Sequence, residues 1–93
     1  MIRTFACDKT EKLYNRQKVR EFANIASVAY RRLVALDSAS ELNDLLIPPG
    51  NRLESLSGDR QGQHSIRINH QFRICFTWSE GNAYDVEITN HYR

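Results

Sequence analysis

The chain has 93 residues, of which 41% are apolar and 26% charged. A chain of this length fits one domain over residues 1–93, and this composition excludes a disordered protein in favour of a folded one. The net charge of +2 is mild, but it comes from ten arginines and only three lysines. Because arginine presents a flat fork of donors that matches phosphate oxygens, this bias allows a nucleic-acid partner without establishing one.

The sequence shows no pattern for export or membrane insertion. Two scattered cysteines, Cys7 and Cys75, are more typical of reduced thiols in a cytosolic protein. A single disulfide between them is the alternative that the sequence leaves open. Charged residues interrupt the N-terminus at once, which excludes a signal-peptide pattern. No apolar run approaches the roughly 20 residues that span a bilayer. We therefore expect a cytoplasmic protein with no membrane partner.

The first half of the chain predicts one short strand followed by helical segments. Residues 1–6 form a β-tolerant run and are interpreted as a strand. Residues 8–14 begin with an Asp-x-x-Glu spacing, which is typical of a capped helix start. A longer helix is predicted over residues 24–37, where apolar side chains recur every three or four residues as one stripe. A second capping signature over residues 38–41 predicts a short helical turn, which the Pro-Pro-Gly at 48–50 ends.

After that break, the pattern changes to the two-residue period of β-strands. Strands are predicted at residues 53–56, 63–69, 72–78 and 84–89, and in the last three the apolar side chains alternate onto one face. Short connections favour antiparallel neighbours, so residues 50–93 are expected to form one meander. The predicted fold class is α+β in the order β-α-α-β-β-β-β, with two helices packed on a twisted antiparallel sheet.

Polar and cationic side chains gather on two neighbouring strands of this meander. Ser65, Arg67 and Asn69 alternate with the isoleucines of their strand, so they point to the face opposite the apolar one. Arg73 opens the next strand inside an otherwise apolar run. If these side chains converge, the sheet offers guanidinium groups that can hold a phosphate.

Groups able to move protons lie at the ends of the same strands. His64 begins one strand, and His91 and Tyr92 end the last. Such a set could cleave RNA without a metal ion: a base takes the 2′-hydroxyl proton, the oxygen attacks the adjacent phosphate, and arginine stabilises the developing charge. Losing one charge-stabilising donor typically costs about 10²–10³ in rate, and a well-placed acid or base contributes about 10²–10⁴. The candidate catalytic residues are Arg67, Arg73, His64, His91 and Tyr92, and the further candidates for RNA contact are Arg52, Arg60, Asn69 and Arg93.

Each of these residues also has a structural interpretation. Arg73 could pair with Asp85 or Glu87 across the strands, Arg67 and the histidines could be exposed to solvent, and Tyr92 could pack its ring over the sheet edge. The chain has no glycine-rich phosphate loop and no Cys/His set with zinc spacing. Asp85 and Glu87 are more typical of a solvated pair than of a metal site, so no metal or cofactor is predicted.

Two consecutive segments resemble a known family. Residues 51–69 (NRLESLSGDRQGQHSIRIN) and 71–78 (QFRICFTW) resemble the HigB toxins of the RelE/ParE-like superfamily, also called plasmid-maintenance or killer proteins. Both segments are too long to resemble the family easily by chance. The resemblance covers essentially the whole chain, because the same pattern continues in four shorter segments: residues 1–5, 36–39, 48–50 and 85–88.

This resemblance implies the toxin of a type II toxin–antitoxin module with a RelE-like fold. Such a toxin is a ribosome-dependent endoribonuclease that cuts mRNA and inhibits translation. The resemblance further implies a HigA-type helix-turn-helix antitoxin, which neutralises the toxin and represses their operon. The toxin would then contact operator DNA only through the antitoxin. Arg73 matches the arginine of the family's aromatic-Arg-hydrophobic strand, and Arg67 and Asn69 lie where the family places inward-facing polar or cationic groups.

The chain departs from its family at two places. Relatives commonly end in an Asp-Tyr-His-like sequence, whereas here His91 precedes Tyr92. Some relatives carry His and Lys where this chain has Glu54 and Ser57. These departures leave a second function open, that of a catalytically weak or inactive homologue acting as an antitoxin-binding operon co-repressor. A gyrase poison is a further alternative, which the sequence resembles less.

Overall fold

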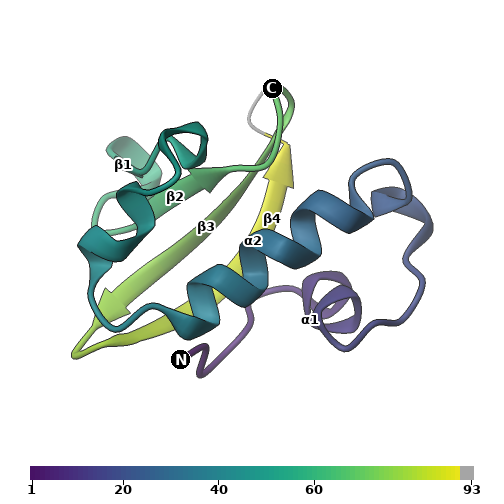
Figure 1. Cartoon of the computed structure of the whole chain (residues 1–93), viewed down its shortest axis with the longest axis horizontal. Helices are drawn as coiled ribbons and strands as arrows, with labels where there is room; N and C mark the ends of the chain where they lie inside the picture. Colours follow the sequence, from purple (N-terminus) through teal and green to yellow (C-terminus); the bar gives the residue numbers. More distant parts are fainter. Residues whose placement is uncertain (91–93) are drawn as a thin grey trace.

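A computed structural model describes residues 1–90 of the chain. Two helices, α1 (Asp8–Tyr14) and α2 (Ala26–Ser38), lie side by side on one face of an antiparallel sheet (Figure 1). The strands follow the order β1-β2-β3-β4 and are β1 (Glu54–Ser55), β2 (His64–Arg67), β3 (Phe72–Ser79) and β4 (Asn82–Asn90). The predicted α+β fold and antiparallel meander are confirmed for the described residues.

Both helices form where the sequence predicts them, but α1 begins differently. In α2, the predicted apolar stripe is buried, with Ala29, Leu33 and Leu36 all at 0% exposure. The Asp8 cap predicted for α1 is wrong, because Cys7 is the N-cap residue and no side chain caps the helix. Asp8 instead lies in the first turn, where its charge suits the helix dipole. Neither helix is long and apolar enough to cross a membrane, as holds for every helix in residues 1–90.

The segment that links α2 to β1 folds as short 3₁₀ turns, η2 (Leu42–Leu46) and η3 (Pro49–Asn51). The capping signature predicted over residues 38–41 is displaced by three residues. The carboxylate of Asp44 accepts the backbone N–H groups of Ser40 and Glu41 at 2.9 and 3.1 Å. Asp44 performs this role because α2 already extends to residue 38, so the next helical turn can begin only after it.

The N-terminal segment predicted as a strand lies alongside β4 without forming a continuous strand. It makes two isolated parallel bridges, Ile2 to Ala83 and Phe5 to Val86. Between these bridges Asp85 adopts a left-handed backbone conformation with φ 55°. This turn of the backbone interrupts the ladder, and the Asp85 N–H donates to the Thr4 hydroxyl at 2.8 Å instead.

The same irregularity corrects the alternation predicted over residues 84–89, which puts Tyr84 on the same face as Val86. The register between β3 and β4 shifts between Cys75 and Thr77. As a result Ala83, rather than Tyr84, joins Val86 on the buried face, both with 0% exposure. A β-bulge adds one residue to one strand and reverses the alternation beyond it, which a simple two-residue period cannot anticipate.

Strand register separates an apolar face from a polar one. Ile66, Ile74 and Ile88 lie opposite one another on β2, β3 and β4, and they belong to the same core cluster as Leu33 and Leu36 of α2. Because neighbouring residues of a strand point to opposite faces, the residues between these isoleucines face away from the helices. The polar face of the sheet is therefore on the side that the helices leave uncovered.

Candidate active site

The uncovered face of the sheet carries two rows of polar side chains. One row crosses the strands as Arg67, Arg73 and Thr89, and the next crosses them as Ser65, Cys75 and Glu87. Opposed residues of antiparallel strands project to the same side. The polar face predicted from Ser65 and Arg67 is thus formed, and Arg73 lies on it.

Arg73 is fixed in position by partners from three segments. Only 8% of the residue is exposed. Its Nε donates to the Ser65 hydroxyl at 2.7 Å, and its Nη2 donates to the carbonyl of Arg52 at 2.9 Å. Nη2 also lies 3.5 Å from a carboxylate oxygen of the exposed Glu54. The cross-strand pairing considered for Arg73 is therefore wrong, since its acidic neighbour is Glu54 rather than Glu87 or Asp85.

The backbone conformation of Arg52 explains how a carbonyl reaches this guanidinium. Arg52 ends η3 in the left-handed region with φ 46°. Its exposed side chain projects away while its carbonyl accepts from Arg73. Because a buried guanidinium is tolerated only with hydrogen-bond partners, this carbonyl and Ser65 together hold Arg73 in one position.

A second arginine enters the face from the loop between β1 and β2. Arg60 belongs to the 3₁₀ turn η4 (Gly58–Arg60), and its Nη1 donates to the Gln63 side chain at 2.9 Å. Its guanidinium also lies 3.4 Å from the carboxylate of Glu87. Both members of this pair are about one-third exposed, so the pair positions Arg60 more than it stabilises the fold.

Arg60 and Arg73 border a small cavity of about 170 Å³. That is roughly the volume that five or six water molecules occupy in the liquid, which suits a phosphate group better than a whole nucleotide. Among residues 1–90, the Nη1 group of Arg73 has no hydrogen-bond partner. The other residues that line the cavity are Leu56, Ser65, Cys75, Thr89 and Asn90.

The Cys75 thiol, which lines this cavity, is a weak acid. Burial raises the pKa of Cys75 above its ordinary value, and the nearby guanidinium of Arg60 only partly opposes this effect. The thiol is therefore neutral at physiological pH. Because the thiolate is the nucleophilic form, Cys75 contributes shape and polarity here rather than a nucleophile.

The structure separates several of the predicted site residues. Arg67 lies beside Arg73 on the same face, whereas His64 pairs with Phe76 and packs against its ring at 6.0 Å on the other face. Asn69 forms the turn before β3, since its side-chain oxygen accepts the N–H groups of Gln71 and Phe72 at 2.8 and 2.7 Å.

Three predicted residues, His91, Tyr92 and Arg93, lie outside the described residues. Sequence reasoning did not select Thr89 and Cys75 as site residues. The sequence did contain a signal for both residues, because the two-residue alternation that places Arg73 on the polar face places Cys75 and Thr89 there too. Within residues 1–90, no three His, Cys, Asp or Glu side chains come together as a possible set of metal ligands.

The sequence is similar to proteins of one toxin family. A family model described as the RelE-like toxin of the type II toxin–antitoxin system HigB matches residues 3–91. Toxin HigB-1 of Vibrio cholerae is 42% identical over 69 residues, which cover 74% of this chain and 73% of that protein. Endoribonuclease HigB of Proteus vulgaris is 40% identical over 57 residues, which cover 57% of this chain and 56% of that relative.

The fold has counterparts among solved structures. The chain superimposes on the YoeB–YefM complex from Staphylococcus aureus with a TM-score of 0.62 and 19% identity, covering 99% of both chains. At that identity the likeness shows a shared fold only. The family follows instead from the match over residues 3–91. The chain belongs to the HigB family of RelE-like toxins of type II toxin–antitoxin systems.

Proposed function

We propose that this toxin is an endoribonuclease that cleaves mRNA on the ribosome and so inhibits translation. The observation that carries the proposal is the fixed, buried guanidinium of Arg73 beside a cavity that Arg60 also lines. Two permanent cations in one small cavity favour a phosphodiester, because guanidinium forks match phosphate oxygens. The name of the Proteus vulgaris relative, Endoribonuclease HigB, supports the same chemistry.

In the proposed reaction, the RNA strand attacks its own backbone. A base removes the proton of the 2′-hydroxyl, and the 2′-oxygen bonds to the adjacent phosphorus while the bond to the 5′-oxygen breaks. The 5′-oxygen takes a proton from an acid, and the other product ends in a cyclic phosphate. Arg73 and Arg60 stabilise the negative charge that builds on the phosphate oxygens, and Arg67 holds the neighbouring part of the backbone.

His91 and Tyr92 are the proposed proton-transfer groups. They directly follow Asn90, which lines the cavity, and imidazole is the side chain best suited to this task near neutral pH. His64 is not included, since it lies on the opposite face of the sheet. Arg52 and Arg93 are the proposed contacts for flanking phosphates.

The proposed partners are the ribosome and a HigA-type antitoxin. A net charge of +2 attracts free RNA weakly, because non-specific RNA affinity depends on the number of phosphates neutralised. We therefore assign the positioning of mRNA to the ribosome. The family description supports an antitoxin, and the solved neighbour is itself a toxin–antitoxin complex. Contact with operator DNA would then come through that antitoxin.

Induced expression in a bacterial host tests this function. We expect growth arrest with codon-linked cuts in a reporter mRNA, detected by primer extension, and their loss in Arg73→Ala. The matched control is Arg3→Ala, which removes an exposed arginine far from the cavity. Arrest with intact mRNA and a DNA-damage response would instead indicate a gyrase poison. A chain that causes no arrest but tightens antitoxin on its operator would indicate the co-repressor.

A further inference from the structure

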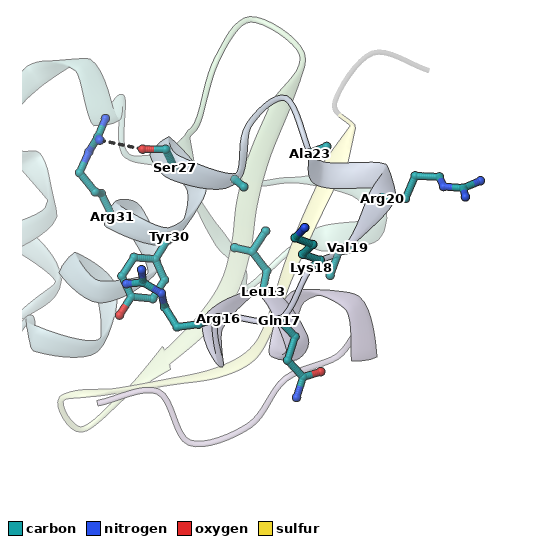
Figure 2. Close-up of a pocket in the computed structure, with 11 residues that line it drawn as sticks. Leu13, Arg16, Gln17, Lys18, Val19, Arg20, Ala23, Ser27, Tyr30 and Arg31 are labelled. Atoms are coloured by element: carbon teal, nitrogen blue, oxygen red, sulfur yellow. Dashed lines mark hydrogen bonds between the residues drawn. The ribbon is translucent and has the colours of Figure 1, made fainter.

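A larger groove lies on the helical side of the molecule, between α1, α2 and the chain that joins them. Its volume is about 900 Å³. The residues that line it include Leu13 from α1, Val19 and Ala23 from the connection, and Ala26 and Tyr30 from α2. Figure 2 shows Leu13, Val19, Ala23 and Tyr30 among them. The groove is therefore large enough for several side chains of a partner.

Four cations, Arg16, Lys18, Arg20 and Arg31, line the same groove. Figure 2 shows Arg20 reaching outward from the connection and Arg31 turned toward Ser27, to which its Nη1 donates at 3.1 Å. Within the described residues 1–90, no acidic residue lines the groove. The three ion pairs formed within residues 1–90 all lie elsewhere, so the groove carries uncompensated positive charge.

The groove is separate from the candidate active site. The helices cover the face of the sheet that carries Ile66 and Ile74, whereas Arg73 projects from the other face. The groove and the 170 Å³ cavity share no lining residue. A ligand in the groove therefore leaves the Arg73 cavity open.

The chemistry of the lining favours a protein segment over RNA. Single-stranded RNA binds proteins by stacking bases on free aromatic faces. Among the described residues, Tyr30 is the one aromatic side chain that lines the groove. Its ring is already contacted by the Arg16 guanidinium, 4.5 Å from the ring centre. The other apolar residues of the lining are aliphatic, which suits the apolar stripe of a helix rather than a sugar–phosphate backbone.

We propose that this groove binds an acidic amphipathic helix of a protein partner. The apolar stripe of the helix packs on Leu13, Val19 and Ala26, and its carboxylates face Lys18, Arg20 and the other cations of the rim. Charge complementarity provides the sign selectivity, since the four lining cations, none of which belongs to an ion pair within residues 1–90, repel a basic helix.

Two synthetic peptides test the proposal on the full chain. Both are 16-residue fluorescent helices with leucine at helical spacing; one carries glutamate at its other positions and the other carries lysine. We expect saturable binding of the glutamate peptide by fluorescence anisotropy, weakening with salt, and no binding of the lysine peptide. The double variant Lys18→Glu/Arg20→Glu should weaken binding at least about tenfold, since reversing two rim charges opposes the same carboxylates.

Arg3→Glu is the control for reversing a charge outside the groove, because Arg3 is exposed and does not line the groove. Circular dichroism checks that each variant is folded, and growth arrest should persist in the groove variant. Failure of the glutamate peptide to saturate, or equal weakening by Arg3→Glu, overturns the proposal. Binding of a 12-residue uridine RNA that the groove variant abolishes overturns it in favour of nucleic acid, and a dimer abolished by that variant overturns it in favour of a second copy. Growth arrest tests the proposed nuclease activity and not peptide binding. The proposal for the groove and the proposal for the nuclease can therefore be refuted independently of each other.

Discussion

The hydroxyl of Ser65 accepts a 2.7 Å hydrogen bond from Nε of Arg73 on the neighbouring strand. Both residues are buried, with 0% and 8% exposure. A buried guanidinium has one strongly preferred direction only when its donors are satisfied. Ser65 therefore determines where the Nη1 edge of Arg73 points, and it is a positioning residue for the proposed phosphate site.

Replacing Ser65 by alanine should affect both stability and activity. The free energy of unfolding should fall by about 1.5–3 kcal/mol, because Ser65→Ala removes a hydrogen bond to a buried charged group. Cleavage of mRNA should fall by about ten- to a hundredfold, since small misplacements of a catalytic group are costly. Urea unfolding and primer extension measure the two effects. Exposed Ser57→Ala is the control, and equal changes in both proteins would contradict the role of Ser65.

Under the proposed function, Glu87 should compete with RNA for Arg60. The carboxylate lies 3.4 Å from the guanidinium, and both side chains are partly exposed. Glu87→Gln should change stability by less than about 1 kcal/mol and should tighten binding of an RNA oligonucleotide by up to about fivefold. Fluorescence anisotropy at low salt measures this affinity. The control Glu11→Gln makes the same charge change on α1, and an equal gain in that protein would show a general charge effect instead.

Two threonines provide a matched pair of tests for the attachment of β4. The hydroxyl of buried Thr10 accepts the Ile88 N–H at 3.0 Å, and that of exposed Thr4 accepts the Asp85 N–H at 2.8 Å. Thr10→Val should lower the free energy of unfolding by about 1–3 kcal/mol, because it leaves a buried donor without a partner. Thr4→Val should cost less than about 0.5 kcal/mol, since water can replace the lost acceptor. Equal losses in urea unfolding would refute this difference.

The buried thiol of Cys75 should give the fold a specific alkaline sensitivity. Burial raises the pKa of Cys75 above its ordinary 9.0 in the folded protein, so the folded state holds this proton more tightly than the unfolded state. The stabilisation is complete below pH 9 and is lost as pH rises through the higher folded pKa. Cys75→Val should therefore flatten the decline of stability above pH 9, whereas Cys7→Val should keep it. An unchanged alkaline decline in the Cys75 variant would contradict the prediction.

Most of the fold follows from periodicity, and the differences arise where a local feature interrupts it. The stripe of α2 and the alternation over residues 63–69 predict their elements because each buries one face. The N-terminal segment was predicted as a strand but makes only isolated bridges, since Asp85 turns the partner backbone away from a regular ladder. Aspartate tolerates this conformation better than most residues, but the two-residue alternation of the strand gives no sign of it at Asp85.

The candidate site was predictable only in part. Alternation places Ser65, Arg67 and Arg73 on one face, and the same alternation applied to His64 would have placed it with the isoleucines on the other. The contact between Arg73 and the carbonyl of Arg52 could not be predicted, because it depends on a left-handed backbone conformation at a residue that rarely adopts one. Likewise, the sequence does not reveal that Glu87 pairs with Arg60 rather than Arg73.

The most direct test of the central claim is single-turnover cleavage of mRNA on purified ribosomes by wild type and Arg73→Lys. The substitution keeps the charge but removes the fork that Ser65 and Arg52 hold, and Arg3→Lys is the control. We predict that Arg73→Lys lowers the rate by about 10²–10³ while circular dichroism shows a folded protein. Cleavage at the wild-type rate by a folded Arg73→Lys protein would contradict the account.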